Sequence, residues 1–133
     1  MGVSIYSNQS IYEFDMGYAT FFRLRTLIAT MIDKELGEAY GESLYQKSRA
    51  EDIREVLDRK HLAVEYKDVI DFLFMSDCGG SISHKVCRQL YELLKNVSRE
   101  QSLDYIRFRS GGWYDFKAFL MECYSKHRKM RWS

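Results

Sequence analysis

DFLFMSDCGGSISHKVCRQLYELL, the stretch from Asp71 to Leu94, decides the fold that the sequence predicts. Apolar residues recur at helical spacing before and after a polar break at 76–80, which indicates one helix on each side. Gly79 and Gly80 tolerate a positive φ, so we expect one of them to turn the chain. Ser81 or Ser83 can cap the second helix by accepting a hydrogen bond from a free backbone N–H. The stretch therefore predicts two helices joined by a tight glycine turn.

The same turn invites a calcium-binding interpretation, because an EF-hand loop also places a glycine between oxygen ligands. With Gly80 in that glycine position, the first ligand position falls on Met75 and the last, which needs an acid, falls on Val86. Only Asp77 and weak hydroxyl oxygens remain as ligands. The spacing of the nearby cysteines and histidine is not that of a zinc site either. The sequence therefore predicts no metal site and no cofactor.

Cys78 lies just before the second helix, a position in which cysteine thiols can be reactive. One alternative is therefore a small enzyme that uses Cys78 as its nucleophile, with His84 or His127 as the base. The chain has no nucleotide-binding glycine loop, no G-x-S-x-G elbow and no H-E-x-x-H helix. These absences favour a protein that is not an enzyme.

The run SDCGGSISHKVCRQLYELL, residues 76–94, resembles a segment of a family of small, functionally uncharacterised bacterial and phage-borne proteins. These proteins carry Ser-Asp-Cys-(Asp/Gly)-Gly between two helices. They also tend to start an N-terminal helix with Gly-Tyr and paired arginines, here Gly17-Tyr18, Arg23 and Arg25. The resemblance covers about half of the chain. It implies a compact helical fold, no established activity and, by analogy, a phage or mobile-element accessory role such as counter-defence.

Composition points to one soluble globular domain spanning residues 1–133. Hydrophobic residues make up 46% of the chain and aromatic residues 15%, which excludes general disorder, and the absence of proline favours helices. The formal net charge of +1 gives no global field for nucleic acid or a membrane surface. No apolar run reaches the ~20 residues that span a bilayer, and no secretory signal precedes the charged N-terminal segment. Three cysteines without a disulfide framework predict a cytoplasmic protein.

The remaining chain predicts a mainly α fold, a compact bundle of four or five helices with room for a two-stranded β appendage. Two short strands or an extended arm are expected at 3–6 and 11–14, and a strand at 105–109. The expected helices are 16–36 (capped by Asp15 and ended by Gly37), a short helix or turn at 38–47, 49–61 (capped by Ser48) and 113–128. The predicted core comprises Phe21, Leu24, Ile28, Ile53, Leu57, Ile70, Leu73, Phe74, Val86, Leu90, Leu94, Phe116, Phe119 and Leu120.

Arginines and aromatic residues gather beside a double glycine at 105–114, which suggests a binding site. Guanidinium groups bind phosphate or carboxylate through two parallel hydrogen bonds, and aromatic faces stack on planar ligands. The leading hypothesis is a binding protein for a partner protein or a small anionic, nucleotide-like ligand. Its candidate site residues are Tyr105, Arg107, Arg109, Trp113 and Tyr114, helped by Arg23 or Arg25.

Two other interpretations of the charged segments stay open at this point. The residues at 105–109 can simply alternate between core and solvent on a strand. The basic tail, Lys126 to Ser133, ends near Trp132 and could contact nucleic-acid phosphates, although no second basic stripe supports it. Oligomeric state is not fixed by the sequence, so a homo-oligomer is also compatible with it.

Overall fold

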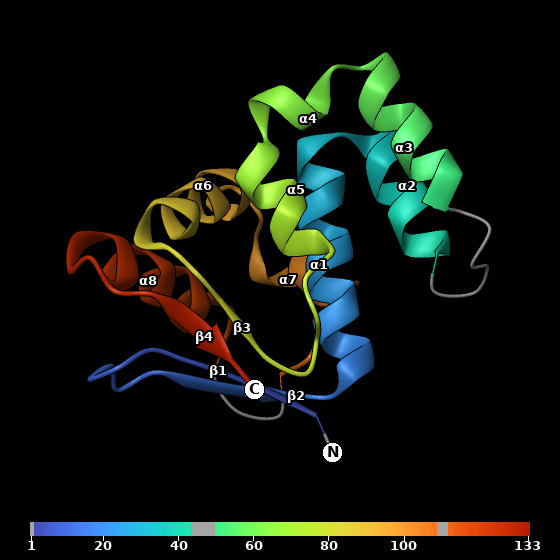
Figure 1. The fold of residues 1–133 in the computed structure, drawn as a ribbon. Coiled ribbons are helices and arrows are strands. Elements are labelled where there is room, and N and C mark those ends of the chain that lie inside the picture. The colour runs from blue at the N-terminus through green and yellow to red at the C-terminus, as the bar shows by residue number, and fades with distance from the viewer. Residues whose placement is uncertain (1, 44–49, 109–111) are drawn as a thin grey trace.

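The computed structural model describes residues 2–43, 50–108 and 112–133, and in these ranges the protein is mainly helical with a small antiparallel sheet (Figure 1). No helix in these ranges has the length and apolar character needed to cross a membrane. The elements in chain order are β1 (Val3–Tyr6), β2 (Glu13–Met16), α1 (Tyr18–Ile32), α2 (Lys34–Glu42), α3 (Ala50–Arg59), α4 (Leu62–Glu65), α5 (Lys67–Leu73), β3 (Gly80–Ile82), α6 (His84–Leu94), α7 (Arg99–Ser102), α8 (Trp113–Ser125) and β4 (Met130–Trp132).

The sheet joins both ends of the chain. Its strand order is β2-β1-β4-β3, and every neighbouring pair is antiparallel. The C-terminal strand β4 thus lies between β1 and β3, and the backbones of Ser4 and Ser133 exchange hydrogen bonds of 2.9 and 3.1 Å. Figure 1 shows the helices on one side of this sheet. The expected two-stranded appendage is therefore a four-stranded sheet against the helical body.

One predicted strand is wrong. Residues 105–108, the described part of the expected strand at 105–109, form no strand. The backbone N–H groups of Tyr105 and Ile106 both donate to the carbonyl of Ser102, at 3.0 and 2.9 Å. These bonds fold the segment back on the end of α7, so its N–H groups do not serve a sheet.

Helices α1 and α2 are separate, contrary to the single helix expected over 16–36. Asp33 ends α1 and caps α2, because its carboxylate accepts from the backbone N–H groups of Glu35 and Leu36 at 2.9 and 3.1 Å. Gly37 does not end a helix but lies inside α2, where an added Cβ would be 2.1 Å from the Thr30 hydroxyl oxygen. The glycine is needed for close packing of α2 on α1. Asp15 lies in β2, and Gly17 is the N-cap of α1.

The central stretch folds as predicted in outline and differently in its turn. Ser83 caps α6 by accepting from the Val86 N–H at 3.4 Å, as one of the two expected caps. Neither central glycine has a positive φ; Gly80 instead lies in β3, where an added Cβ would be 2.5 Å from the Trp132 ring. Position 80 therefore requires a glycine because the Trp132 indole packs against it, and not because the chain makes a left-handed turn there.

The core is one continuous cluster around which the helices and the sheet pack. Twelve of the fourteen predicted core residues are buried; the exceptions are Leu57, which is half-buried, and Phe74, which is 55% exposed. Phe74 follows the last residue of α5, so it leaves the apolar face of that helix and sets its ring edge-on to Tyr40. The predicted cap Ser48 and residues 44–47 lie outside the described ranges.

Candidate functional site

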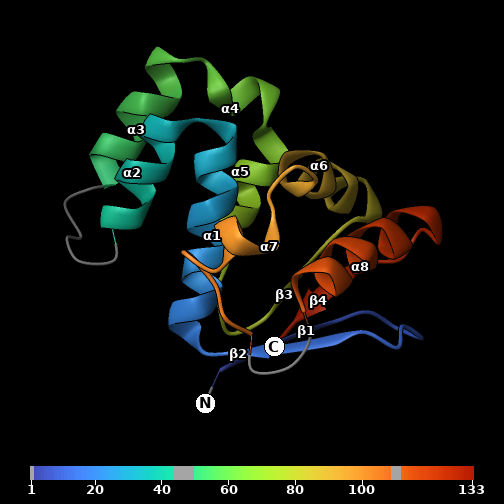
Figure 2. The ribbon, with the colours of Figure 1, turned by 180° about the vertical axis from the view of Figure 1, so that it is seen from behind.

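A surface hollow of about 360 Å³ lies between α7 and the start of α8, on the side seen in Figure 2. We call it the arginine hollow. Residues of α7, of the segment that follows it and of the start of α8 line it: Arg99, Ser102, Leu103, Ile106, Arg107, Phe108, Gly112 and Trp113.

Local hydrogen bonds shape this hollow. Ser98 and Gln101 form a capping box that starts α7, with bonds of 3.2 and 2.9 Å. Ser102 then donates to the Arg99 carbonyl at 2.7 Å. On the α8 side, the indole N–H of Trp113 donates to the Val97 carbonyl at 2.8 Å. Ile106 and Trp113 are almost fully buried and form an apolar floor.

Two guanidinium groups border the arginine hollow. Arg99 and Arg107 are both exposed, and neither guanidinium group has a hydrogen-bond or ion-pair partner among the described residues. The ammonium of Lys117 lies near the same end of α8, 5.7 Å from the Trp113 ring, and donates to the Val97 carbonyl at 3.2 Å. The hollow therefore combines unused cationic donors with an apolar floor, a combination suited to an anionic group that carries an apolar body.

Only part of the sequence-predicted site meets here. Arg107 and Trp113 line the hollow together, but Tyr114 points away, 61% exposed beneath the Lys117 ammonium, and Tyr105 lines grooves toward α1. Arg109 lies outside the described residues. The prediction did not include Arg99. The S-x-x-Q pattern at 98–101 is the sequence signal that could have identified it, because this pattern predicts the start of a helix beside the candidate site.

The paired arginines of α1 do not join the arginine hollow. Arg23 is exposed on α1, whereas Arg25 is 5% exposed and points to the far side of that helix, toward α5. The Arg25 Nη1 group donates to the carbonyls of Met75 and Leu73 at 2.7 and 3.4 Å. Burial lowers the pKa of Arg25, and nearby Tyr40 and Asp77 act in the opposite direction.

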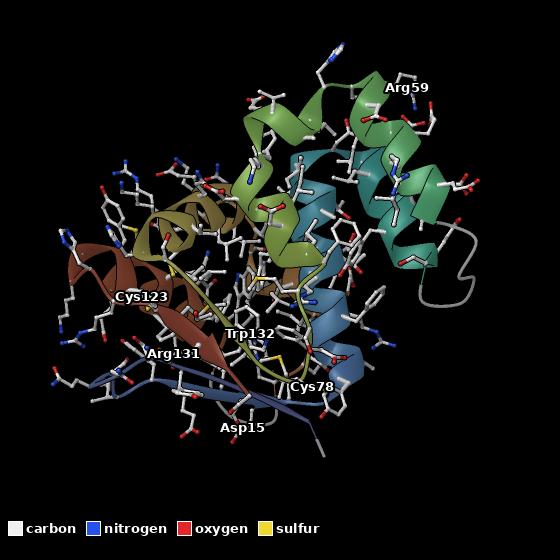
Figure 3. The ribbon with its side chains drawn as sticks, in the orientation of Figure 1. Asp15, Arg59, Cys78, Cys123, Arg131 and Trp132 are labelled. Atoms are coloured by element: carbon white, nitrogen blue, oxygen red, sulfur yellow. The ribbon has the colours of Figure 1, made fainter. Side chains whose placement is uncertain are left out.

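Cys78 and the two candidate bases lie apart. Cys78 is exposed on the turn before β3 (Figure 3), with its Sγ 3.5 Å from an Asp77 carboxylate oxygen. His84 starts α6 beyond the other end of β3, and its ring stacks on His127 with centroids 4.6 Å apart. Within the described residues, neither His84 nor His127 contacts Cys78.

The other cysteines are buried and face each other in the core. Cys87 on α6 and Cys123 on α8 are free thiols. The neighbouring Cys123 thiol, together with burial, raises the pKa of Cys87. A buried neutral thiol is inert as a nucleophile. Across the described ranges, no group of three or more His, Cys, Asp or Glu side chains is placed to hold a metal ion.

The basic tail is part of the folded body. Met130–Trp132 form β4, and Trp132 is 1% exposed with its indole N–H donating to the Ser76 carbonyl at 2.9 Å. Arg128 forms an ion pair with Glu122 at 3.7 Å. Trp132 is therefore a core residue and does not stack on a nucleic-acid base.

Comparison of the chain with protein-family models, with curated proteins and with solved structures finds no match. The resemblance carried by residues 76–94 therefore stays a prediction.

Proposed function

We propose that this protein is a non-enzymatic binding protein that recognises an anionic group through the arginine hollow. One observation carries the proposal: the exposed guanidinium groups of Arg99 and Arg107 border a single hollow and have no partner among the described residues. A guanidinium presents several N–H donors in a planar fork that matches carboxylate and phosphate oxygens.

The walls of the hollow limit the class of ligand. Leu103 is 37% exposed and Phe108 is half-buried, so a ligand with a flat or apolar body gains contact area beside the two cations. The volume of about 360 Å³ lies at the lower end of the range for small-molecule sites, roughly 300–1,000 Å³. A small nucleotide-like or aromatic anion fits these features; an acidic side chain of a partner protein offers the same carboxylate with less apolar contact.

Context enters the proposal from the sequence. A cytoplasmic location agrees with three free cysteines, since oxidising compartments favour disulfides. The family resemblance adds a phage or mobile-element accessory role, which concerns where the protein acts and not the chemistry of the hollow.

Native mass spectrometry tests the proposal directly. The protein is incubated with the small-molecule fraction of a cell lysate, and we expect a discrete added mass of a few hundred daltons. The double variant Arg99→Ala/Arg107→Ala should lose this adduct. The matched control is Arg23→Ala, because Arg23 is also an exposed arginine but lies on α1, outside the hollow.

Two results would contradict the proposal. One is a wild-type protein that carries no adduct from any lysate fraction. The other is an adduct that the double variant retains at the wild-type level, since binding would then occur elsewhere on the molecule.

A further inference from the structure

Arg25 is a buried cation in a cage of aromatic rings. Its guanidinium carbon lies 4.4 Å from the Phe21 ring centroid, 5.0 Å from that of Phe72 and 5.8 Å from that of Trp132. Figure 3 shows the labelled Trp132 inside the molecule, between the sheet and α1. Ring faces attract a cation and explain why α1 can keep Arg25 in the interior.

Only one of the three guanidinium nitrogens has a hydrogen-bond acceptor. Nη1 donates to the Met75 and Leu73 carbonyls, whereas Nε and Nη2 are buried and have no partner among the described residues. In a planar guanidinium, the Nε–H and one Nη2–H point the same way, and this parallel pair matches the two oxygens of a carboxylate. A buried charged donor without an acceptor is costly, so a partner for this pair is expected.

Arg25 also lines a second hollow, of about 270 Å³, which we call the Arg25 hollow. It is lined by Phe21, Phe22, Arg25, Met75, Ser76 and Asp77. It thus brings together Arg25 of α1 and the start of the Ser-Asp-Cys-Gly-Gly turn, which are some fifty residues apart in the sequence. Of its other polar lining residues, Ser76 already uses its hydroxyl and carbonyl oxygens for Cys78 and Trp132, and Asp77 is exposed.

We propose that the Arg25 hollow is a second, separate binding site, which takes a small carboxylate onto the Nε–Nη2 edge of Arg25. A carboxylate is planar and carries one charge, which suits a site walled by the rings of Phe21 and Phe22. Phosphate brings more negative charge toward the exposed carboxylate of Asp77 at the rim, so phosphate is the poorer ligand.

Binding requires a small movement of the protein. Nε and Nη2 are closed off from solvent, so a ligand reaches them only when one wall of the hollow shifts. The wall on the side of the turn is exposed at Ser76 and Asp77. Two hydrogen bonds hold it at Ser76: the Cys78 N–H donates to the Ser76 hydroxyl oxygen at 3.1 Å, and the Trp132 indole N–H donates to the Ser76 carbonyl at 2.9 Å. Association is therefore expected to be slower than for an open site.

Nuclear magnetic resonance of the Arg25 Nε–H group tests the site on the intact wild-type protein. The resonance is assigned through its connectivity to the Arg25 side chain, and sodium acetate or formate is added at constant ionic strength. We expect a saturable downfield shift with the carboxylates, a weaker one with inorganic phosphate and none with chloride. An N-acetylated tripeptide with a free C-terminal carboxylate, compared with its C-terminal amide, distinguishes a chain end from a small acid as the source.

Asp77→Asn decides between an external carboxylate and Asp77 itself as the partner of Arg25. If the partner is external, removing the like charge at the rim strengthens acetate binding about two- to fivefold and leaves the Arg25 signal of the free protein unchanged. A large change of that signal without ligand would mean that Asp77 already occupies the edge, which overturns the proposal.

The titration also separates the two sites. The variant Arg99→Ala/Arg107→Ala should respond to acetate at Arg25 like the wild type, whatever becomes of the arginine hollow. An Arg25 signal that does not move with any carboxylate at tens of millimolar overturns the second site and leaves the proposed function untouched.

Discussion

The arginine hollow and the Arg25 hollow use the same side chain in opposite ways. Around the arginine hollow, Arg99 and Arg107 are exposed, and the described lining comes from the short helix α7, the residues that follow it and the start of α8. Around the Arg25 hollow, a single arginine is buried among core rings and bound to carbonyls at the end of α5. An unpaired guanidinium in water keeps its hydration, whereas a buried one does not. The arginines of the arginine hollow can therefore bind an anion without affecting the stability of the fold. In the Arg25 hollow, the same guanidinium group contributes to the stability of the fold and to the binding of a ligand.

The largest expected effect concerns Trp132, one of the three rings around the Arg25 guanidinium group. Trp132→Ala removes a side chain that is 1% exposed, packs on Phe21 and Phe72 and donates to the Ser76 carbonyl. We expect the free energy of unfolding to fall by about 3–5 kcal/mol in urea titrations. The control is Arg131→Ala on the same strand, whose side chain is only half-buried. Equal losses for the two variants would show that Trp132 is not a core residue.

The next effect is a loss of stability at alkaline pH that originates beside Arg25. Tyr40 is 4% exposed and donates its hydroxyl proton to the Leu73 carbonyl at 2.8 Å; burial raises the pKa of Tyr40 to about 12. Below pH 10 the hydroxyl is protonated in both the folded and the unfolded chain. Between pH 10 and 12 the unfolded chain ionises first, so the free energy of unfolding should fall by about 2–3 kcal/mol.

Tyr40→Phe isolates this contribution. The variant lacks the ionisable group, so its stability should decline less steeply between pH 10 and 12 than that of the wild type in parallel urea titrations. Parallel pH profiles would mean that Tyr40 is solvated in solution and that this side of α5 is more open than the structure places it.

The two adjacent glycines of the central turn give a smaller effect with a built-in control. Gly80→Ala places a Cβ about 2.5 Å from the Trp132 ring, which the packed core cannot absorb without moving the indole. We expect a loss of about 1–3 kcal/mol, measured by urea unfolding. Gly79→Ala finds its nearest atom at 3.7 Å, an ordinary contact, and should stay close to wild type. If Gly79→Ala lost more stability than Gly80→Ala, the close approach of the Trp132 ring to Gly80 would be contradicted.

These glycines also mark the limit of local sequence rules. Helical periodicity and capping correctly located α6 and the start of α8, and one of the two expected caps of α6, Ser83, is the observed one, because those signals are contained in neighbouring residues. Gly37 and Gly80 were expected to end a helix and to turn the chain, yet each is small because Thr30 or Trp132 approaches it from elsewhere. Strands β3 and β4 were missed, because a run of three residues is too short to predict a strand and their pairing joins positions some fifty residues apart.

The candidate sites show the same difference between features that neighbouring residues determine and features that depend on distant elements. The periodicity of α1 predicted that Arg23 and Arg25 point to different faces, and Arg23 is exposed while Arg25 is buried. It did not predict which of the two is inside, because that depends on the rings of Phe72 and Trp132, which come from distant elements. Arg107 and Trp113 were expected together and do line one hollow, since they are close in the sequence.

The smallest expected effect is the change in stability when the arginines of the arginine hollow are removed. It tests whether these arginines, unlike Arg25, contribute nothing to the fold. Arg99→Ala and Arg107→Ala, singly or together, remove exposed side chains without partners among the described residues, so the free energy of unfolding should change by less than about 0.5 kcal/mol per site. The same urea titration serves as the measurement, with Arg23→Ala as the matched exposed arginine. A loss well above that of Arg23→Ala would mean that the two guanidinium groups hold α7 against α8. The arginine hollow would then resemble the Arg25 hollow, in which the cation belongs to the fold first and to a ligand second.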